Sequence, residues 1–259
     1  MCWYRSSVTN TMPEPIKIGR VHEMERARRT LREWILSGEL RPGEPISQVR
    51  VAEQLGVSRG PLREALRLLE REGFVDQEHN RRARVAPFSL SDWDQLSAMR
   101  VSLEPLAVAL ALPRLCASDH RRLDEILQRM AELAQGEDGN SWEEQHREFH
   151  ATLLRPAGQR FEMEFSHLYD HFERYRRVYA AQDAVSFKGN RAGEHEAIAA
   201  AARAGNVDLA SSLVAQHLAR NAVVAIGTID PAYEPVAVRR ALQLHVTVDT
   251  STSRSVRPN

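Results

Sequence analysis

The amino-acid sequence predicts a mainly α-helical protein in two parts: three helices with a small β-hairpin, followed by an antiparallel all-α bundle of six to seven helices. Three observations support this prediction. Apolar residues recur at helical spacing through most of the chain. Glycine and proline separate these helical stretches at short intervals. Strand-like pattern is confined to two short segments, residues 74–75 and 84–86.

Composition indicates a soluble globular protein. Of the 259 residues, 42% are hydrophobic and 27% charged, which is ordinary for that class. No stretch approaches the roughly 20 apolar residues that span a membrane, and the first residues lack the apolar core of a signal peptide. Two cysteines, Cys2 and Cys116, cannot form a disulfide framework. We therefore expect a cytoplasmic protein without membrane contact.

The zero net charge hides an asymmetry between the two parts. Residues 1–90 contain 16 basic and 12 acidic residues, and the remainder contains 19 and 23. A basic domain joined to an acidic one is typical of a nucleic-acid reader with a partner domain, although random scatter of surface charge is the alternative. The low aromatic content, 6%, disfavours a binder of single strands that stacks bases.

Residues 18–88 have the pattern of a winged helix-turn-helix, preceded by a flexible arm over 1–17. We expect helices over about 21–36, 47–55 and 58–71, and a wing made of the two short strands. Gly56 lies between the second and third helices, where a tight turn uses a positive φ. This arrangement is a compact DNA-reading module.

The third expected helix carries the candidate DNA contacts. Its start, around Ser58, exposes backbone donors that favour phosphate. Arg59 and Arg63 are four residues apart and share one face, and Arg67 continues that row. Arginine can form two hydrogen bonds with guanine, so the row predicts DNA reading; a merely solvated helix face is the alternative.

The sequence pattern over residues 89–229 predicts the helical bundle. Ser91 or Asp92 is expected to cap a helix that runs to about residue 112, and further helices are expected at roughly 118–135, 141–155, 159–181, 188–204 and 206–227. Pro231 and Pro235 break the last helix, so residues 230–259 are expected to form a disordered tail.

Four histidines in the bundle have a metal-binding pattern. His146 and His150 share a helix face, while His195 and His217 lie on two later helices. Imidazoles from three helices can converge in a bundle on a divalent metal ion, with zinc or nickel suiting nitrogen ligands best. Isolated histidines on the surface or in the core are the alternative.

The DNA-reading segment resembles the GntR superfamily of bacterial regulators. The resemblance covers about residues 20–88 and rests on Leu36-Ser37-Gly38, Arg41-Pro42-Gly43, Gly56-Val57-Ser58-Arg59, Arg63-Glu64-Ala65-Leu66 and Glu72-Gly73-Phe74-Val75. It implies that Arg59, Gly60 and Arg63 contact bases or phosphate and that the wing tip near Arg81 and Arg82 enters the minor groove. With Ser58 and Arg67 from the helix pattern, and with Arg50, these residues form the candidate DNA-binding set. Within that pattern, Gly60 stands where a threonine is usual, and Arg82 stands where the wing usually has glycine.

The bundle resembles the FadR-type ligand-binding domain of these regulators, the FCD domain, over about residues 92–225. The matching residues are Arg100 to Glu104, Phe149-His150, Glu194 to Ile198 and His217-Leu218. The resemblance implies a metal on His150, His195 and His217, with His146 in place of the usual aspartate. Losing that anionic ligand leaves two possibilities: a carboxylate effector supplies the missing charge, or metal binds weakly or not at all.

Three further residues are candidate effector ligands. Arg100 matches an arginine that faces the effector pocket in relatives, where a guanidinium can hold a carboxylate; a surface ion pair with Glu104 is the alternative. His167 and His171 form a second pair four residues apart. They either line the same cavity or lie on a partly exposed helix face.

Together these features predict a regulator rather than an enzyme. We expect a homodimeric repressor that binds a palindromic double-stranded operator and is released by a small organic acid. A metal-dependent enzyme is the first alternative; against it, Glu194 and Glu196 are expected to point away from the histidines, which leaves no general base there. A constitutive DNA-binding dimer with an empty bundle is the second.

Overall fold

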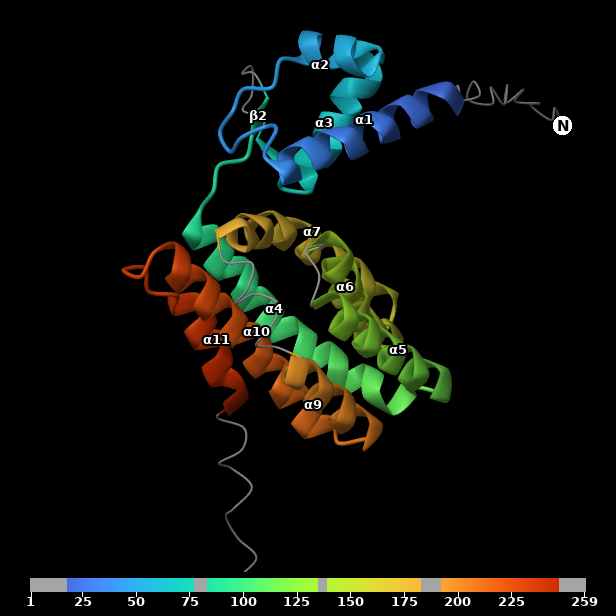
Figure 1. The fold of residues 1–259 in the computed structure, drawn as a ribbon, viewed down its shortest axis with the longest axis vertical. Helices are drawn as coiled ribbons and strands as arrows, with labels where there is room; N and C mark the ends of the chain where they lie inside the picture. The colour runs from blue at the N-terminus through green and yellow to red at the C-terminus, as the bar shows by residue number, and fades with distance from the viewer. Residues whose placement is uncertain (1–17, 77–82, 135–138, 183–191, 247–259) are drawn as a thin grey trace, which may run out of the picture. The chain divides into compact units, whose positions relative to one another are not determined.

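A computed structural model describes residues 18–76, 83–134, 139–182 and 192–246, and the chain divides into two compact units between Pro87 and Phe88 (Figure 1). The expectations for the arm over 1–17 and for Arg81 and Arg82 lie outside the described residues. The two units are described separately below.

The N-terminal unit is the expected winged helix-turn-helix. Its elements are α1 (Ile18–Ser37), α2 (Gln48–Leu55), α3 (Arg59–Arg71), β1 (Val75–Asp76) and β2 (Arg84–Val85). The two strands pair antiparallel, with Val75 opposite Val85. Leu31, Leu62, Leu66 and Phe74 are fully buried, so α1, α3 and the hairpin share one small core.

Local signals fix the turn between α2 and α3. The Ser47 side chain accepts a hydrogen bond from the Arg50 amide and caps α2. Gly56 ends that helix with a φ of 58°, a left-handed conformation that glycine adopts without strain. Val57 is buried under this turn, and α3 begins two residues later at Arg59.

The C-terminal unit is all helical in its described part. Its seven α-helices are α4 (Leu90–Ala111), α5 (Ala117–Ala134), α6 (Gly139–Leu154), α7 (Gln159–Gln182), α9 (Ala192–Arg203), α10 (Val207–Ile229) and α11 (Val236–Val246). Two short 3-10 turns, η1 (Leu112–Arg114) and η2 (Arg155–Ala157), follow α4 and α6.

Helix α4 is the central helix of this unit and packs against α10, α11 and α7 (Figure 1). Contrary to the sequence expectation, the segment Leu90–Arg114 is long and apolar enough to cross a membrane, with a mean hydropathy of 1.3 over 18 residues. It also carries Asp94, Arg100 and Glu104, all buried in the bundle. A helix that is apolar on all sides because it is surrounded by other helices explains this composition.

Two sequence expectations about the ends of this unit are wrong. Ser89, rather than Ser91 or Asp92, caps α4, since its Oγ accepts a hydrogen bond from the Asp92 amide. The tail expected to be disordered from residue 230 contains α11. Pro235 precedes this helix, where proline is compatible with a helix start.

Buried Asp94 holds the N-terminus of α11. Its Oδ2 accepts a hydrogen bond from the Ala237 amide at 3.0 Å, and its Oδ1 accepts one from the Val238 amide at 2.9 Å. A carboxylate in this position satisfies two of the amides that a helix start leaves unpaired. Since the cap lies more than 140 residues away in sequence, local pattern cannot reveal it.

Candidate DNA-binding surface and metal centre

The exposed face of α3 presents most of the expected DNA contacts. Ser58, Arg59, Arg63 and Arg67 are exposed, and Leu62, Ala65, Leu66 and Leu69 bury the opposite face in the core. Arg50 is exposed on α2. Sequence spacing alone therefore identified the solvent face of the recognition helix correctly.

The three arginines of α3 differ in their partners. Arg67 donates a hydrogen bond to Glu64 at 2.8 Å, and both side chains remain more than half exposed. Within the described part of the chain, neither Arg59 nor Arg63 forms an ion pair. The charge available to an incoming phosphate or base is therefore greatest at Arg59 and Arg63.

The start of α3 offers donors to an anion. The Ser58 side chain forms no capping hydrogen bond, so its hydroxyl is not used by the helix itself. Gly60 is half-buried, and a Cβ atom added to it would meet no atom within 4 Å. The helix N-terminus is thus open, and its backbone amides and dipole favour phosphate.

The structure brings the four predicted histidines of the bundle together. His146 and His150 come from α6, His195 from α9 and His217 from α10, and one potential ligand atom from each lies within 4.8 Å of all the others. All four are buried, with His146 the most exposed at 6%. Four imidazole nitrogens that converge in a buried site are the donor set that zinc or nickel prefers.

Side chains behind the histidines orient the rings. His150 Nδ1 lies 3.3 Å from Glu104 Oε2, and His217 Nδ1 donates to Glu194 Oε2 at 2.7 Å. With Nδ1 held by a carboxylate, Nε2 is the nitrogen that can face a metal. His146 differs, because its Nδ1 lies 3.2 Å from the hydroxyl of buried Tyr169.

Burial and charge set the protonation states of the site. Burial lowers the pKa of His146 well below its ordinary value, and the three neighbouring histidines add to the effect, so this ring is neutral and can act as a ligand. Burial raises the pKa of Glu104, but the adjacent Arg100 and His150 outweigh it and lower that pKa to about 2. Glu104 is therefore ionised.

Glu194 is held in its charged form in a similar way. Burial raises the pKa of Glu194, but hydrogen bonds and charge from His217 and Arg220 outweigh burial, so the net effect is a lowered pKa. Sequence reasoning expected this glutamate to point away from the cluster, and that expectation is wrong, because its side chain reaches across to α10. Ionised Glu104 and Glu194 place negative charge directly behind His150 and His217.

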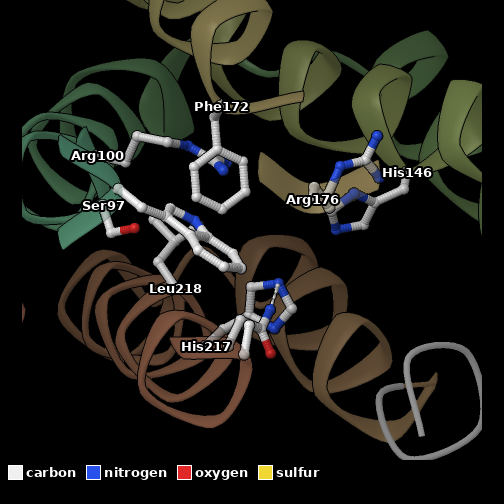
Figure 2. A pocket seen from close by; sticks show the side chains of 10 residues that line it. Ser97, Arg100, His146, Phe172, Arg176, His217 and Leu218 are labelled. Atoms are coloured by element: carbon white, nitrogen blue, oxygen red, sulfur yellow. Dashed lines mark hydrogen bonds between the residues drawn. The ribbon is translucent and has the colours of Figure 1, made fainter. Parts of the chain in front are cut away.

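A small pocket of about 30 Å³ adjoins the cluster (Figure 2). It is lined by Trp93, Ser97, Arg100, His146, Phe172, Arg176, His217, Leu218, Asn221 and Ala225, and is called the central pocket below. Ser97 Oγ and Arg100 Nη2 are buried there without a hydrogen-bond partner among the described residues. Buried polar atoms in this state commonly mark a binding site.

Arg100 pairs with Glu104 and also lines the central pocket. It donates to Glu104 at 2.5 Å, and both side chains are almost fully buried, so this is not a surface pair. Its guanidinium also lies over the ring of Phe172, 4.6 Å from the centroid, and lines the central pocket (Figure 2). Glu104 thus fixes the arginine while leaving part of its fork directed at the pocket.

His167 and His171 do not line the central pocket. His167 is exposed and His171 half-buried on α7, and their Nε2 atoms are 3.1 Å apart. Sequence reasoning also missed Trp93 and Tyr169, which reach the site from helix positions that read as ordinary core.

Comparisons with known proteins agree with this architecture. Residues 23–85 match the family described as bacterial regulatory proteins of the gntR family, and residues 95–220 match the FCD domain. The regulator BphR of Paraburkholderia xenovorans is 30% identical over 217 residues, which cover 79% of this chain and 86% of BphR. The chain belongs to the GntR family.

Two further GntR-type relatives extend the comparison. The transcriptional repressor GlaR of Escherichia coli is 26% identical over 199 residues, covering 73% of this chain and 90% of GlaR. A crystal structure of a GntR regulator from Rhodococcus superposes with a TM-score of 0.68 at 25% identity, covering 82% of this chain and all of that one. This GntR protein is a DNA-binding transcriptional regulator, and its relatives are regulators rather than enzymes.

Proposed function

We propose that this GntR regulator is a metal-dependent sensor of a small carboxylate, and that binding of the acid in the central pocket releases it from its operator. The observation that carries the proposal is the position of Arg100 Nη2 and Ser97 Oγ, two buried polar atoms beside the four-histidine cluster. A guanidinium and a hydroxyl at a cation site form a receptor for a carboxylate.

The four histidines are suited to hold the ion. Four imidazoles with carboxylates behind two of them supply nitrogen donors and compensating charge for a divalent cation such as zinc or nickel. When bound, the ion supplies positive charge that attracts a carboxylate oxygen. Arg100 then orients the acid, and Trp93 and Phe172 exclude water around it.

The size of the central pocket links binding to a structural change. A volume of about 30 Å³ holds roughly two water molecules. An acid larger than two water molecules must therefore displace side chains that line the pocket. Trp93 is one of those side chains, and its ring stacks on Tyr175 with an angle of 15° and contacts Phe88 edge-on at 6.0 Å.

Phe88 is the first residue of the helical unit and follows Pro87, the last residue of the N-terminal DNA-binding unit. It also contacts Tyr175, at 5.3 Å between ring centroids. Movement of Trp93 therefore changes the packing of the residue from which the chain continues into the DNA-binding unit.

The DNA-binding part of the proposal requires a homodimer. One chain offers one recognition helix, and helix-turn-helix regulators read palindromic operators with two, placed about 34 Å apart. Two-fold pairing of identical chains supplies this arrangement. Repression is favoured by the relative GlaR, whose name records a repressor.

Metal analysis and an operator-binding assay test the proposal together. We expect purified protein to contain about one zinc or nickel ion per chain and His195→Ala to contain much less, while His120→Ala, on α5 outside the cluster, keeps the ion. A panel of short mono- and dicarboxylates is then added to the protein–operator complex. Equal metal in His195→Ala and wild type would exclude the ion site, and unchanged operator affinity with every acid would exclude the sensor.

A further inference from the structure

The histidine pair of α7 repeats half of the buried cluster on the surface of the same unit. His167 and His171 are four residues apart on α7, as His146 and His150 are on α6. In the α6 pair the Nε2 atoms are 3.3 Å apart, with ring centroids 4.8 Å apart and planes at 76°. In the α7 pair the corresponding values are 3.1 Å, 4.7 Å and 87°. The two pairs thus have nearly the same geometry.

That separation matches what a metal ion requires of two imidazoles. Metal–nitrogen bonds of about 2.0–2.1 Å put two ligand atoms roughly 2.9 Å apart at a right angle and about 3.3 Å apart at a tetrahedral angle. The value of 3.1 Å lies between these limits. The rings therefore need little rearrangement to bind one ion, and a rigid helix holds them in place.

The environment differs from that of the buried cluster in accessibility. His167 is exposed and His171 half-buried, whereas His146 and His150 are buried. An ion from solution can reach the α7 pair without any opening of the bundle. Two imidazoles hold an ion less tightly than four, so an ion at the α7 pair should exchange more readily than one in the buried cluster.

We propose that His167 and His171 form a second, solvent-accessible site for a divalent transition metal, separate from the four-histidine cluster. Imidazole donors select copper, nickel or zinc over magnesium or calcium, which prefer oxygen ligands. The site is independent of the proposed sensor function, because neither histidine lines the central pocket or belongs to the cluster.

Retention of the untagged full-length chain on immobilised Ni²⁺ tests the site directly. A tethered ion can approach an exposed pair but not four histidines of which none is more than 6% exposed. We expect the wild type to be retained, and His167→Ala and His171→Ala to elute at clearly lower imidazole concentration. His22→Ala is the matched control, because it removes an exposed histidine of α1 and should elute with the wild type.

Calorimetric titration with Ni²⁺ gives a second readout in solution. His171→Ala should lose one class of site while any binding by the buried cluster persists, and His195→Ala should keep the site on α7. Circular dichroism verifies that each variant is folded; alanine is well tolerated on an exposed helix face. Elution of both α7 variants with the wild type, or a wild type that is not retained, would overturn the proposal.

Discussion

Among the residues that the structure describes, Arg63 forms no ion pair, whereas Arg67 pairs with Glu64. Arg63→Ala should weaken operator binding by about 1–3 kcal/mol if its guanidinium reads a base. Arg67→Ala should cost less, because its guanidinium is already hydrogen-bonded to Glu64 and must leave that partner before it can contact DNA. Fluorescence anisotropy with labelled operator at fixed salt compares them, and equal losses would contradict the ranking.

Gly60 is the residue at which a gain of affinity is expected. A Cβ atom added there meets no atom within 4 Å, so Gly60→Thr should fold normally and place a hydroxyl near the start of α3. One added hydrogen bond to phosphate should improve operator affinity by about 0.5–1.5 kcal/mol. Gly60→Val provides the control of similar shape without a hydroxyl. If both variants bind equally well, the gain does not come from the hydroxyl.

Glu194 should act on the metal through His217. Because Glu194 holds His217 Nδ1 at 2.7 Å, Glu194→Gln should weaken metal affinity roughly 10- to 100-fold without removing a ligand. Glu196→Gln, one residue beyond His195 on the same helix, should leave the affinity unchanged. Competition with a chromophoric chelator measures both, and equal affinities would mean that Glu194 has no orienting role.

At the residue scale, the sequence predicted the four converging histidines better than the residues that hold their rings in place. Spacing placed His146 and His150 on one face and His195 and His217 on two later helices, and all four converge. Glu194 was missed because neighbours on a helix usually point apart, and only the packing of α9 on α10 shows where its side chain ends. Residues that act across helices leave no periodic signal.

At the scale of single elements, α11 depends on one distant carboxylate. Asp94→Ala should destabilise the helical unit by about 1–2 kcal/mol, because two amides at the start of α11 lose their acceptor. Asp92→Ala, on the first turn of the same helix α4, is a more exposed comparison. Thermal unfolding checks the order, and a smaller loss for Asp94→Ala than for Asp92→Ala would contradict it.

Helix boundaries were predictable where a local stop signal exists. Gly56 and Ser47 fixed α2, and Gly205 and Asn206 separate α9 from α10. The prediction failed for α11, since Pro231 and Pro235 were taken to end ordered structure. A proline pair next to a helix can equally precede a new one, and burial of Val238 against α4 decides the outcome.

For the whole molecule, the decisive question is how binding of an acid in the central pocket affects operator binding by the N-terminal unit. Phe88 does not line the pocket, but it contacts Trp93, which does. Phe88→Ala should therefore keep metal and carboxylate affinity and lose most of the effect of the acid on operator binding. Coupling of this kind typically amounts to 1–3 kcal/mol, about 5- to 150-fold in affinity.

Phe161→Ala is the matched control, because it truncates a partly buried phenylalanine of the same unit that lies outside the central pocket. Isothermal titration measures acid binding, and operator anisotropy with and without the acid measures coupling. A wild type that ignores the acid refutes the sensor itself. If the wild type and Phe88→Ala respond equally to the acid, the sensor function stands but the role of Phe88 is refuted. The effect of the acid on operator binding must then arise without the contact between Phe88 and Trp93.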